Sequence, residues 1–272
     1  MQRASGVARV GFSCAKGTIR VSDLYQSSPC RVLMPRVDGR DHAETVFINT
    51  AGGVAGGDQL DYALSASDGA TVLATTQASE KIYSAIDRDA RVSMSLSVGA
   101  GSTLEWLPQQ TIAFDGARLR RKTHIDVEGD GRLLALDWLV MGRLARGEVM
   151  KSGSVKDEWT VRRNGRLAWV DALRFTGDLE GLTDMAAVLS GNRALATLVY
   201  VGDDAGDHID LARNLAQSCG CVAGATSVRG ILVARFLASD GLTLLNSVGA
   251  FLDPFRQELS GLSLWPPRLW TC

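Results

Sequence analysis

Residues 49–58 (NTAGGVAGGD) hold four glycines in ten positions, which leaves the backbone open to close approach by a ligand or another chain segment. Gly52 and Gly57 have the spacing of a phosphate-binding loop, but Asp58 stands where that loop needs a lysine. Val54 likewise occupies the position of the second glycine in the dinucleotide-binding fingerprint. We therefore interpret the segment as a tight crossing in a packed β-structure, with nucleotide binding as the weaker alternative.

Imidazole and carboxylate groups are densest around His208, which follows Asp203, Asp204 and Asp207. Nickel accepts this combination of ligands, so His208 and Asp204 are candidates for holding an ion weakly. Acidic residues before a helix also stabilise its positive N-terminal end without any metal. We favour this second, structural interpretation.

Complete catalytic motifs are absent from the sequence, including Gly-x-Ser-x-Gly and His-Glu-x-x-His. Layered β-folds can still bring two carboxylates to the separation that glycoside hydrolysis requires. The candidate pairs are Asp115 with Glu148 and Asp58 with Glu105. A β-rich hydrolase therefore stays open as an alternative function.

Two further groups of residues are candidates for binding a partner protein. Residues 118–122 (RLRRK) form a basic run that suits an acidic partner, although such runs are more often solvated strands. Tryptophans near the C-terminus are candidate anchors, because tryptophan is enriched at the centres of interfaces, with core packing as the alternative. The candidates are Arg118, Arg120, Arg121, Trp265 and Trp270.

The elements that position these residues are mostly strands. Apolar and polar residues alternate over 61–66, 91–98 and 123–128, which indicates strands with one face on a core. If Asn164 and Gly165 form a two-residue hairpin loop, Trp159 lies opposite Val170.

Turn glycines recur along the same part of the chain. Gly69, Gly101, Gly131 and Gly165 follow one another at intervals of 32, 30 and 34 residues, which is typical of stacked β-layers. The spacing predicts a mainly β fold with a layered, β-helix-like arrangement of strands.

Helical periodicity appears only in the C-terminal third. It predicts a helix over 208–218 with Asp207 as its cap, and a second helix over 242–259 whose last turn contains Pro254. No linker divides the chain, so we expect one domain spanning residues 1–272.

Composition excludes several classes of partner and compartment. A net charge of −1 and a pI near 6.3 favour neither nucleic acid nor an anionic membrane. No apolar run reaches the length of about 20 residues that spans a bilayer, and no signal peptide is evident, so we expect a cytoplasmic protein. The five cysteines, an odd number, argue against a disulfide framework.

Four ordered segments together resemble the family of the urease accessory protein UreD, also called UreH. These are residues 48–58, 75–83 (TTQASEKIY), 104–117 (LEWLPQQTIAFDGA) and 142–148 (GRLARGE). Gln110 departs from the pattern, because the family carries a glutamate there.

The resemblance implies a β-rich fold with strands wound in helical layers, and a urease maturation factor without enzymatic activity of its own. Such a chaperone binds the urease apoprotein and UreF, which recruits the GTPase UreG for nickel insertion. A less specific alternative is a β-rich scaffold protein for another metalloenzyme. GTP hydrolysis would then belong to UreG, which is consistent with the absence of a phosphate-binding lysine after Gly57 in this chain.

The resemblance also implies an internal passage for nickel, bound transiently and with no stable cofactor. Carboxylates inside the family-like segments suit such a passage, because scattered oxygen ligands release an ion readily. The candidates are Asp58, Glu80, Asp115 and Glu148.

Overall fold

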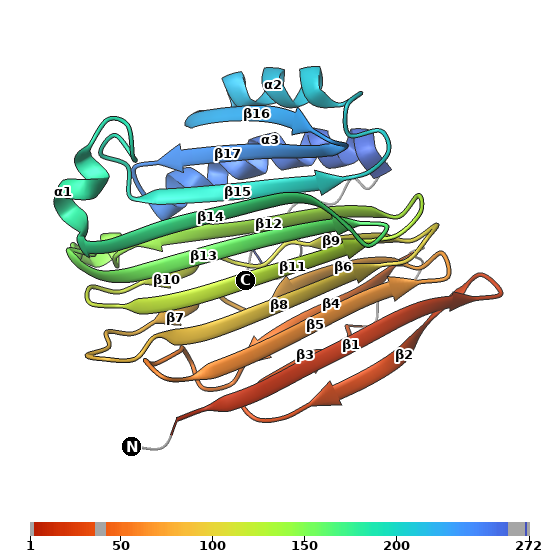
Figure 1. The fold of residues 1–272 in the computed structure, drawn as a ribbon, viewed down its shortest axis with the longest axis horizontal. Helices are drawn as coiled ribbons and strands as arrows, with labels where there is room; N and C mark the ends of the chain where they lie inside the picture. The colour runs from red at the N-terminus through yellow and green to blue at the C-terminus, as the bar shows by residue number, and fades with distance from the viewer. Residues whose placement is uncertain (1–2, 36–41, 261–269, 271–272) are drawn as a thin grey trace.

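A computed structural model describes residues 3–35, 42–260 and 270 of this chain. Two β-sheets pack face to face, and helices cover part of one of them (Figure 1). In the described residues, sheet A has the order β14 (Arg166–Asp178), β13 (Ser152–Arg163), β11 (Arg118–Val127), β8 (Ala90–Val98), β5 (Gln59–Ser67), β1 (Ser5–Ala15) and β2 (Thr18–Gln26).

Sheet B contains more strands than sheet A. Its order is β16 (Val222–Val228), β17 (Ile231–Ala238), β15 (Ala194–Val201), β12 (Arg132–Met141), β9 (Thr103–Trp106), β6 (Thr71–Thr76), β4 (Ala43–Asn49) and β3 (Cys30–Leu33), with β7 (Glu80–Ile82) and β10 (Thr111–Ala113) attached beside β12. A short 3-10 helix, η1 (Leu144–Arg146), follows β12.

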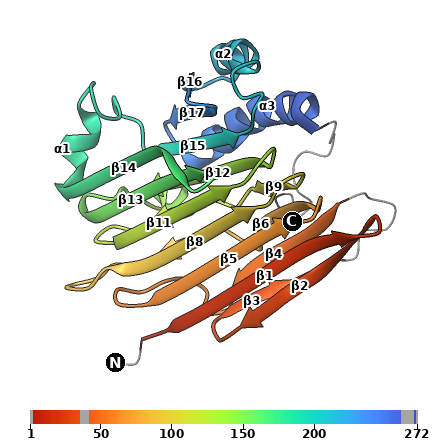
Figure 2. The same ribbon diagram turned by 45° about the vertical axis from the view of Figure 1, so that its right-hand side comes forward.

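The chain alternates between the sheets along its middle part. Strands β5, β8, β11 and β13 are parallel neighbours in sheet A, and β4, β6, β9 and β12 are parallel neighbours in sheet B. Each passage to the other sheet and back therefore adds one strand to each sheet, and Figure 2 shows the stacked strands in a view turned by 45°. The layered, β-helix-like prediction is confirmed.

The predicted turn glycines stack at the corners where the chain changes sheets. The amide of Gly69 donates to Ser102 Oγ at 3.1 Å, and the amide of Gly101 donates to Asp130 Oδ1 at 2.7 Å. Gly165 differs, because it turns β13 into β14 within sheet A as an antiparallel hairpin. The period thus identifies three layer corners and one hairpin.

The predicted register of that hairpin is wrong by one residue. Arg163 lies opposite Arg166 as a two-residue loop requires, but Trp159 lies opposite Asp171. A β-bulge after Val161 causes the shift, because it inserts an unpaired residue into one strand.

The glycine-rich segment is a tight crossing, as interpreted from its sequence. A Cβ on Gly53, whose φ is +152°, would lie 2.5 Å from the Tyr83 ring, and one on Gly56 would overlap Ala85. Val54 pairs with Ile82 of β7 directly beneath. Glycine is therefore required here for packing within the chain.

Two hydrophobic cores hold the layers together. The larger lies between the sheets and includes Phe47, Leu60 and Leu96. The second lies between sheet B and the helices and includes Trp138 and Phe251. The helices that cover this face are α2 (Ile209–Ser218) and α3 (Gly241–Ser260), while α1 (Leu179–Asp184) follows β14.

The two predicted helices are confirmed, with one error at a cap. Asp207 does not cap α2, because the N-cap residue is His208 and no side-chain hydrogen bond caps the helix. Asp240 caps α3 by accepting from the amides of Leu242 and Thr243, both at 2.9 Å. The helix continues through Pro254. Among the described residues, no helix has the length and apolarity needed to cross a membrane.

Candidate functional site

The four family-like segments lie at one edge of sheet B. Each begins at or just before the end of a parallel strand, namely β4, β6, β9 and β12. Parallel strands in register end at the same edge of a sheet. Segments that are far apart in sequence therefore become neighbours.

Short pairings join these segments to one another. The amide of Glu80 in β7 donates to the Gln110 carbonyl at 2.9 Å, and β10 pairs with both β7 and β12. The side-chain amide of Gln110 donates to the Gly241 carbonyl at 2.6 Å, which ties this edge to the start of α3. A carboxylate could not make that bond, so the departure at Gln110 has a structural role.

A cavity of about 180 Å³ lies beneath this edge, between the two sheets. Its wall includes Glu80 and Asn49 near the edge, and Arg121 and Asp137 at depth. Gln77 and Ala78, which line its outer end, are exposed to solvent. The cavity therefore reaches from the surface into the space between the sheets.

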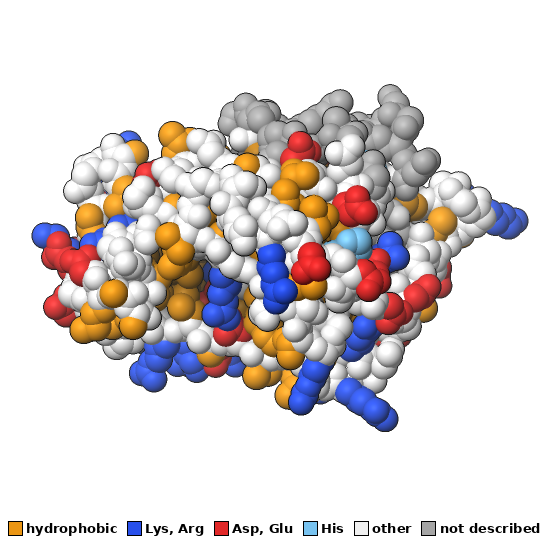
Figure 3. Space-filling model, turned by 90° about the horizontal axis from the view of Figure 1, so that it is seen from above, with side chains coloured by type: hydrophobic (Ala, Val, Ile, Leu, Met, Phe, Trp, Pro, Cys, Tyr) orange, Lys and Arg blue, Asp and Glu red, His pale blue; other side chains and the backbone are white. Residues whose placement is uncertain are grey.

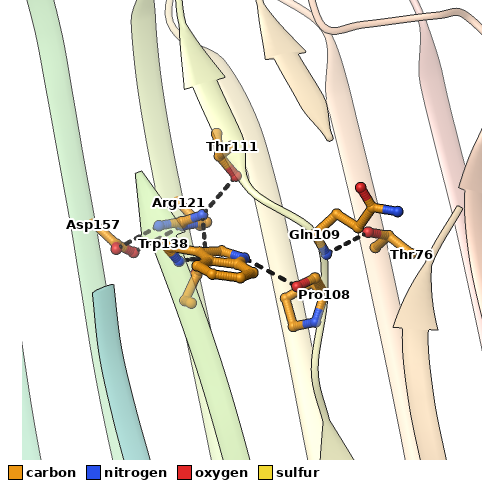
Figure 4. Close-up of polar contacts among 8 residues, drawn as sticks. Thr76, Pro108, Gln109, Thr111, Arg121, Trp138 and Asp157 are labelled. Carbon is orange, nitrogen blue, oxygen red and sulfur yellow. Dashed lines mark hydrogen bonds and ion pairs between the residues drawn. The ribbon is translucent and has the colours of Figure 1, made fainter. Parts of the chain in front are cut away.

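A buried ion cluster closes the deep end of this cavity (Figure 4). Arg121 of β11 contacts Asp137 of β12 (Nη1 to Oδ1, 2.6 Å) and Asp157 of β13 (Nη2 to Oδ2, 2.8 Å). It also donates to Thr111 Oγ1 at 3.0 Å. Three strands from two sheets thus place one guanidinium against two carboxylates.

A second cavity of about 230 Å³ lies on the other side of the cluster and shares Arg121 and Asp137 with the first. Its far wall contains the ion pair between Asp171 and Arg235, whose atoms are 2.5 Å apart. Arg235 is exposed. The two cavities have mostly apolar walls and share the polar residues Arg121 and Asp137 of the cluster.

Two carboxylates that line the first cavity, Asp137 and Glu80, have a raised pKa. Burial raises the pKa of Asp137, and the neighbouring Asp157 raises it further while Arg121 opposes both. Burial also raises the pKa of Glu80 to about 6, against hydrogen bonds from Asn49 at 3.2 Å. Such groups are weak oxygen ligands that exchange protons near neutral pH.

Asp137 and Asp157 were not among the site residues predicted from the sequence. Each is an acidic residue at an inward position of a strand whose other inward neighbours are apolar. For Asp137 the available signal was an acidic residue within the apolar run LLALDWLVM. A buried carboxylate without a partner is unfavourable, so such a residue predicts a nearby counter-ion or hydrogen-bond donor.

Asp58 lies outside both cavities. Its Oδ1 accepts from the Ala4 amide at 2.9 Å and its Oδ2 accepts from the Ala55 amide at 2.8 Å. The carboxylate therefore holds the N-terminal segment and the glycine turn together.

Asp115 and Glu148 lie next to each other outside both cavities, and the Asp115 amide donates to Glu148 Oε1 at 3.3 Å. The hydrogen bond and ion pair with Arg143 lower the pKa of Glu148. Burial alone would raise the pKa of Asp115, but hydrogen bonds from Ser152 and Lys151 outweigh it and lower the pKa. Glycoside hydrolysis needs one carboxyl that keeps its proton, which neither residue provides.

The other candidate hydrolase pair is also separated by its contacts. Glu105 is buried against Arg256 of α3, with Oε2 and Nη2 2.5 Å apart. Asp58 is bonded to backbone amides at the start of β5. Neither candidate pair therefore has the arrangement of two carboxylates that glycoside hydrolysis requires.

Acidic side chains gather near a histidine on the face seen from above in Figure 3. Asp204 accepts from the Tyr200 hydroxyl at 2.6 Å and lies 3.1 Å from Arg132 and 3.5 Å from His208. In the part of the chain that the structure describes, no three His, Cys, Asp or Glu side chains are grouped to hold a metal ion. The contacts favour the structural interpretation of this cluster.

The partner candidates divide between the surface and the interior. Arg118 and Arg120 point outward from sheet A, whereas Arg121 is buried in the ion cluster, so its prediction as a surface contact is wrong. The Trp270 indole donates to Thr75 Oγ1 at 2.9 Å and stacks near Trp138. Trp265 lies outside the described residues.

Comparison with known proteins agrees with the resemblance along the whole chain. A family model described as UreD urease accessory protein matches residues 4–271. A urease accessory protein UreD from Azorhizobium caulinodans is 43% identical over 269 residues, covering 99% of this chain and 97% of that protein. A UreD from Xanthobacter autotrophicus is 40% identical over 269 residues, covering 99% of this chain and 90% of that protein. This chain belongs to the UreD family of urease accessory proteins.

Proposed function

We propose that this chain is a urease maturation factor without enzymatic activity of its own. It binds the urease apoprotein, connects it through UreF to the GTPase UreG, and passes nickel between its two sheets toward the urease active site. Family membership supports the maturation role. The observation that carries the route is that two interior cavities meet at Arg121 and Asp137.

The proposed route runs past three carboxylates. Glu80 lines the first cavity, Asp137 lines both, and Asp157 lines the second. Carboxylate oxygens suit a passing divalent cation, because single ligands of this kind bind and release quickly. Asp58, Asp115 and Glu148 are assigned to the framework instead, because they lie outside both cavities.

The proposed compartment is the cytoplasm. The described cysteines, Cys14, Cys30, Cys219 and Cys221, are free thiols, which supports a reducing compartment.

Deletion of this chain from its host tests the maturation role. Urease activity is measured with limiting and with excess nickel. We expect activity to be lost at limiting nickel, since delivery needs the accessory complex. Normal activity in both conditions would overturn the proposal.

Two substitutions inside the cavities test the route. The double variant Glu80→Gln, Asp137→Asn should co-purify with urease yet lower the nickel content of the enzyme. The double variant Asp115→Asn, Glu148→Gln is the matched control, because it also removes two carboxylates but outside both cavities. Full nickel loading by the Glu80→Gln, Asp137→Asn variant, or an equal loss in the control, would remove the interior from the route.

A further inference from the structure

Strand register places four cations in one row on the outer face of sheet A. Arg91 of β8 lies opposite Arg120 of β11, which lies opposite Lys156 of β13, which lies opposite Arg174 of β14. Neighbouring strands are about 4.8 Å apart, so the row is about 14 Å long. Figure 1 shows these four strands side by side.

This row has few counter-ions of its own. Like charges directly opposite one another in a sheet are unfavourable. Lys156 pairs with Glu158 at 2.8 Å, and Arg120 is 3.9 Å from Asp89. Among the described residues, Arg91 and Arg174 make no ion pair.

The concentration of charge is local. The whole chain has a net charge of −1, so the row is not a consequence of a basic composition. Arg91, Arg120 and Arg174 are all exposed. The row therefore presents positive charge to solvent that its neighbouring carboxylates neutralise only in part.

An open hollow of about 610 Å³ runs beside the row, where β11 and β13 begin and β14 ends. Gly153 and Gly177 lie opposite each other on its floor. Arg118, which pairs with Asp89 at 3.0 Å, and Lys151 add two cations to its wall, and Asp178 adds one carboxylate. Small residues keep the floor low, so another chain can approach the backbone closely.

We propose that the hollow and the adjoining row form a docking groove for a short acidic segment of a partner polypeptide. We call this surface the cationic groove; its residues are Arg91, Arg118, Arg120, Lys151, Lys156, Arg174 and the hollow floor at Ser152, Gly153, Thr176 and Gly177. The inference is independent of the nickel route, because the groove lies on the outer face of the sheet.

The length and borders of the groove favour a polypeptide over a nucleic acid. A span of about 14 Å accommodates about four extended residues or two to three helical turns. Carboxylates border the groove at Asp89, Glu158 and Asp178, so a longer phosphate chain would meet repulsion where it continues. A short segment with its own acidic residues fits between these borders.

A fluorescent ten-residue peptide rich in glutamate tests the proposal directly. The groove variant Arg91→Glu, Arg120→Glu, Arg174→Glu should weaken its binding at least tenfold at low salt. The matched control Arg20→Glu, Arg213→Glu, Arg229→Glu makes the same charge change at exposed positions elsewhere. It should weaken binding less than threefold.

A charge-neutral variant separates shape from electrostatics. Thr176→Trp fills the hollow while leaving all cations in place, and it should also weaken peptide binding about tenfold. A ten-nucleotide single strand should bind more weakly than the peptide. Equal losses in the two arginine variants, no effect of Thr176→Trp, or tighter binding of the oligonucleotide would overturn the proposal. Thermal unfolding of each variant confirms that the fold is retained.

Discussion

Arg120 and Arg121 are neighbours in the chain and identical in type, yet they lie in opposite environments of strand β11. Arg120 projects into solvent within a row of cations. Arg121 is buried between two cavities and bonded to Asp137 and Asp157. Successive side chains in a strand point to opposite faces, so one basic run supplies both a surface charge and an interior one.

The two environments differ in how the charge is balanced. Inside, removal from water makes an unpaired charge very unfavourable. Arg121 is matched by Asp157 on the neighbouring strand β13 and by Asp137 on β12 of the facing sheet. Outside, water and salt screen Arg120, and full neutralisation is unnecessary. The buried charge is therefore matched within the chain. The exposed charge is only partly matched, so it is available for a partner.

The largest expected effect follows from removing the interior cation. Arg121→Ala leaves Asp137 and Asp157 buried without a counter-ion, so it should lower the free energy of unfolding by about 3–5 kcal/mol. Urea unfolding at pH 7.5 measures the change.

The control removes the two acids as well. Arg121→Met combined with Asp137→Asn and Asp157→Asn leaves no unmatched charge, so it should recover most of the lost stability. If the triple variant were as unstable as Arg121→Ala, side-chain packing would explain the loss instead of charge.

A smaller effect should appear in the pH dependence of stability. The pKa of Glu80 is raised to about 6, so the free energy of unfolding should fall as pH rises from about 4.5 to about 6. Glu80→Gln should remove this decline, and its stability relative to the unmodified protein should rise by about 2 kcal/mol across that window. Urea unfolding at intervals of pH measures both proteins.

Glu158 on the outer face gives the opposite sign and serves as the control. The hydrogen bond from Lys156 lowers the pKa of Glu158, so its contribution is present above pH 4.5 and disappears on acidification. The stability of Glu158→Gln relative to the unmodified protein should therefore fall as pH rises. The same trend in both variants would contradict the distinction between the faces.

The smallest effect is expected for the outer cation. Arg120→Ala should change the free energy of unfolding by less than about 0.5 kcal/mol, because the side chain is exposed and its loss relieves repulsion in the row. Urea unfolding with and without added salt measures this. A loss comparable to that of Arg121→Ala would remove the contrast on which the interpretation depends.

Local sequence signals predicted most of the fold. Alternation located the strands, the turn glycines located the layer corners, and the crossing at Gly53 followed from the glycine-rich segment. These features depend on neighbouring residues alone. The bulge after Val161 was not predictable, because an extra residue in one strand leaves the alternation of its partner unchanged.

The interior site was far less predictable. Asp58, Asp115 and Glu148 lie in conspicuous segments but bond to the local framework. Asp137 and Asp157 lie in ordinary strands and meet Arg121 only because three strands from two sheets come together in the fold. Contacts across layers depend on register over long separations, which a single sequence does not specify.

One substitution in the interior and one on the outer face of sheet A together test the central claim, namely that nickel passes between the two sheets. Thr197 lines the second cavity directly opposite Asp137, so Thr197→Phe should narrow the proposed route. Thr160→Phe makes the same change on the outer face. The nickel content of urease matured with each variant at limiting nickel is the measurement. We predict a several-fold lower nickel content with Thr197→Phe and an unchanged content with Thr160→Phe. Full loading with a stably folded Thr197→Phe variant would contradict the account.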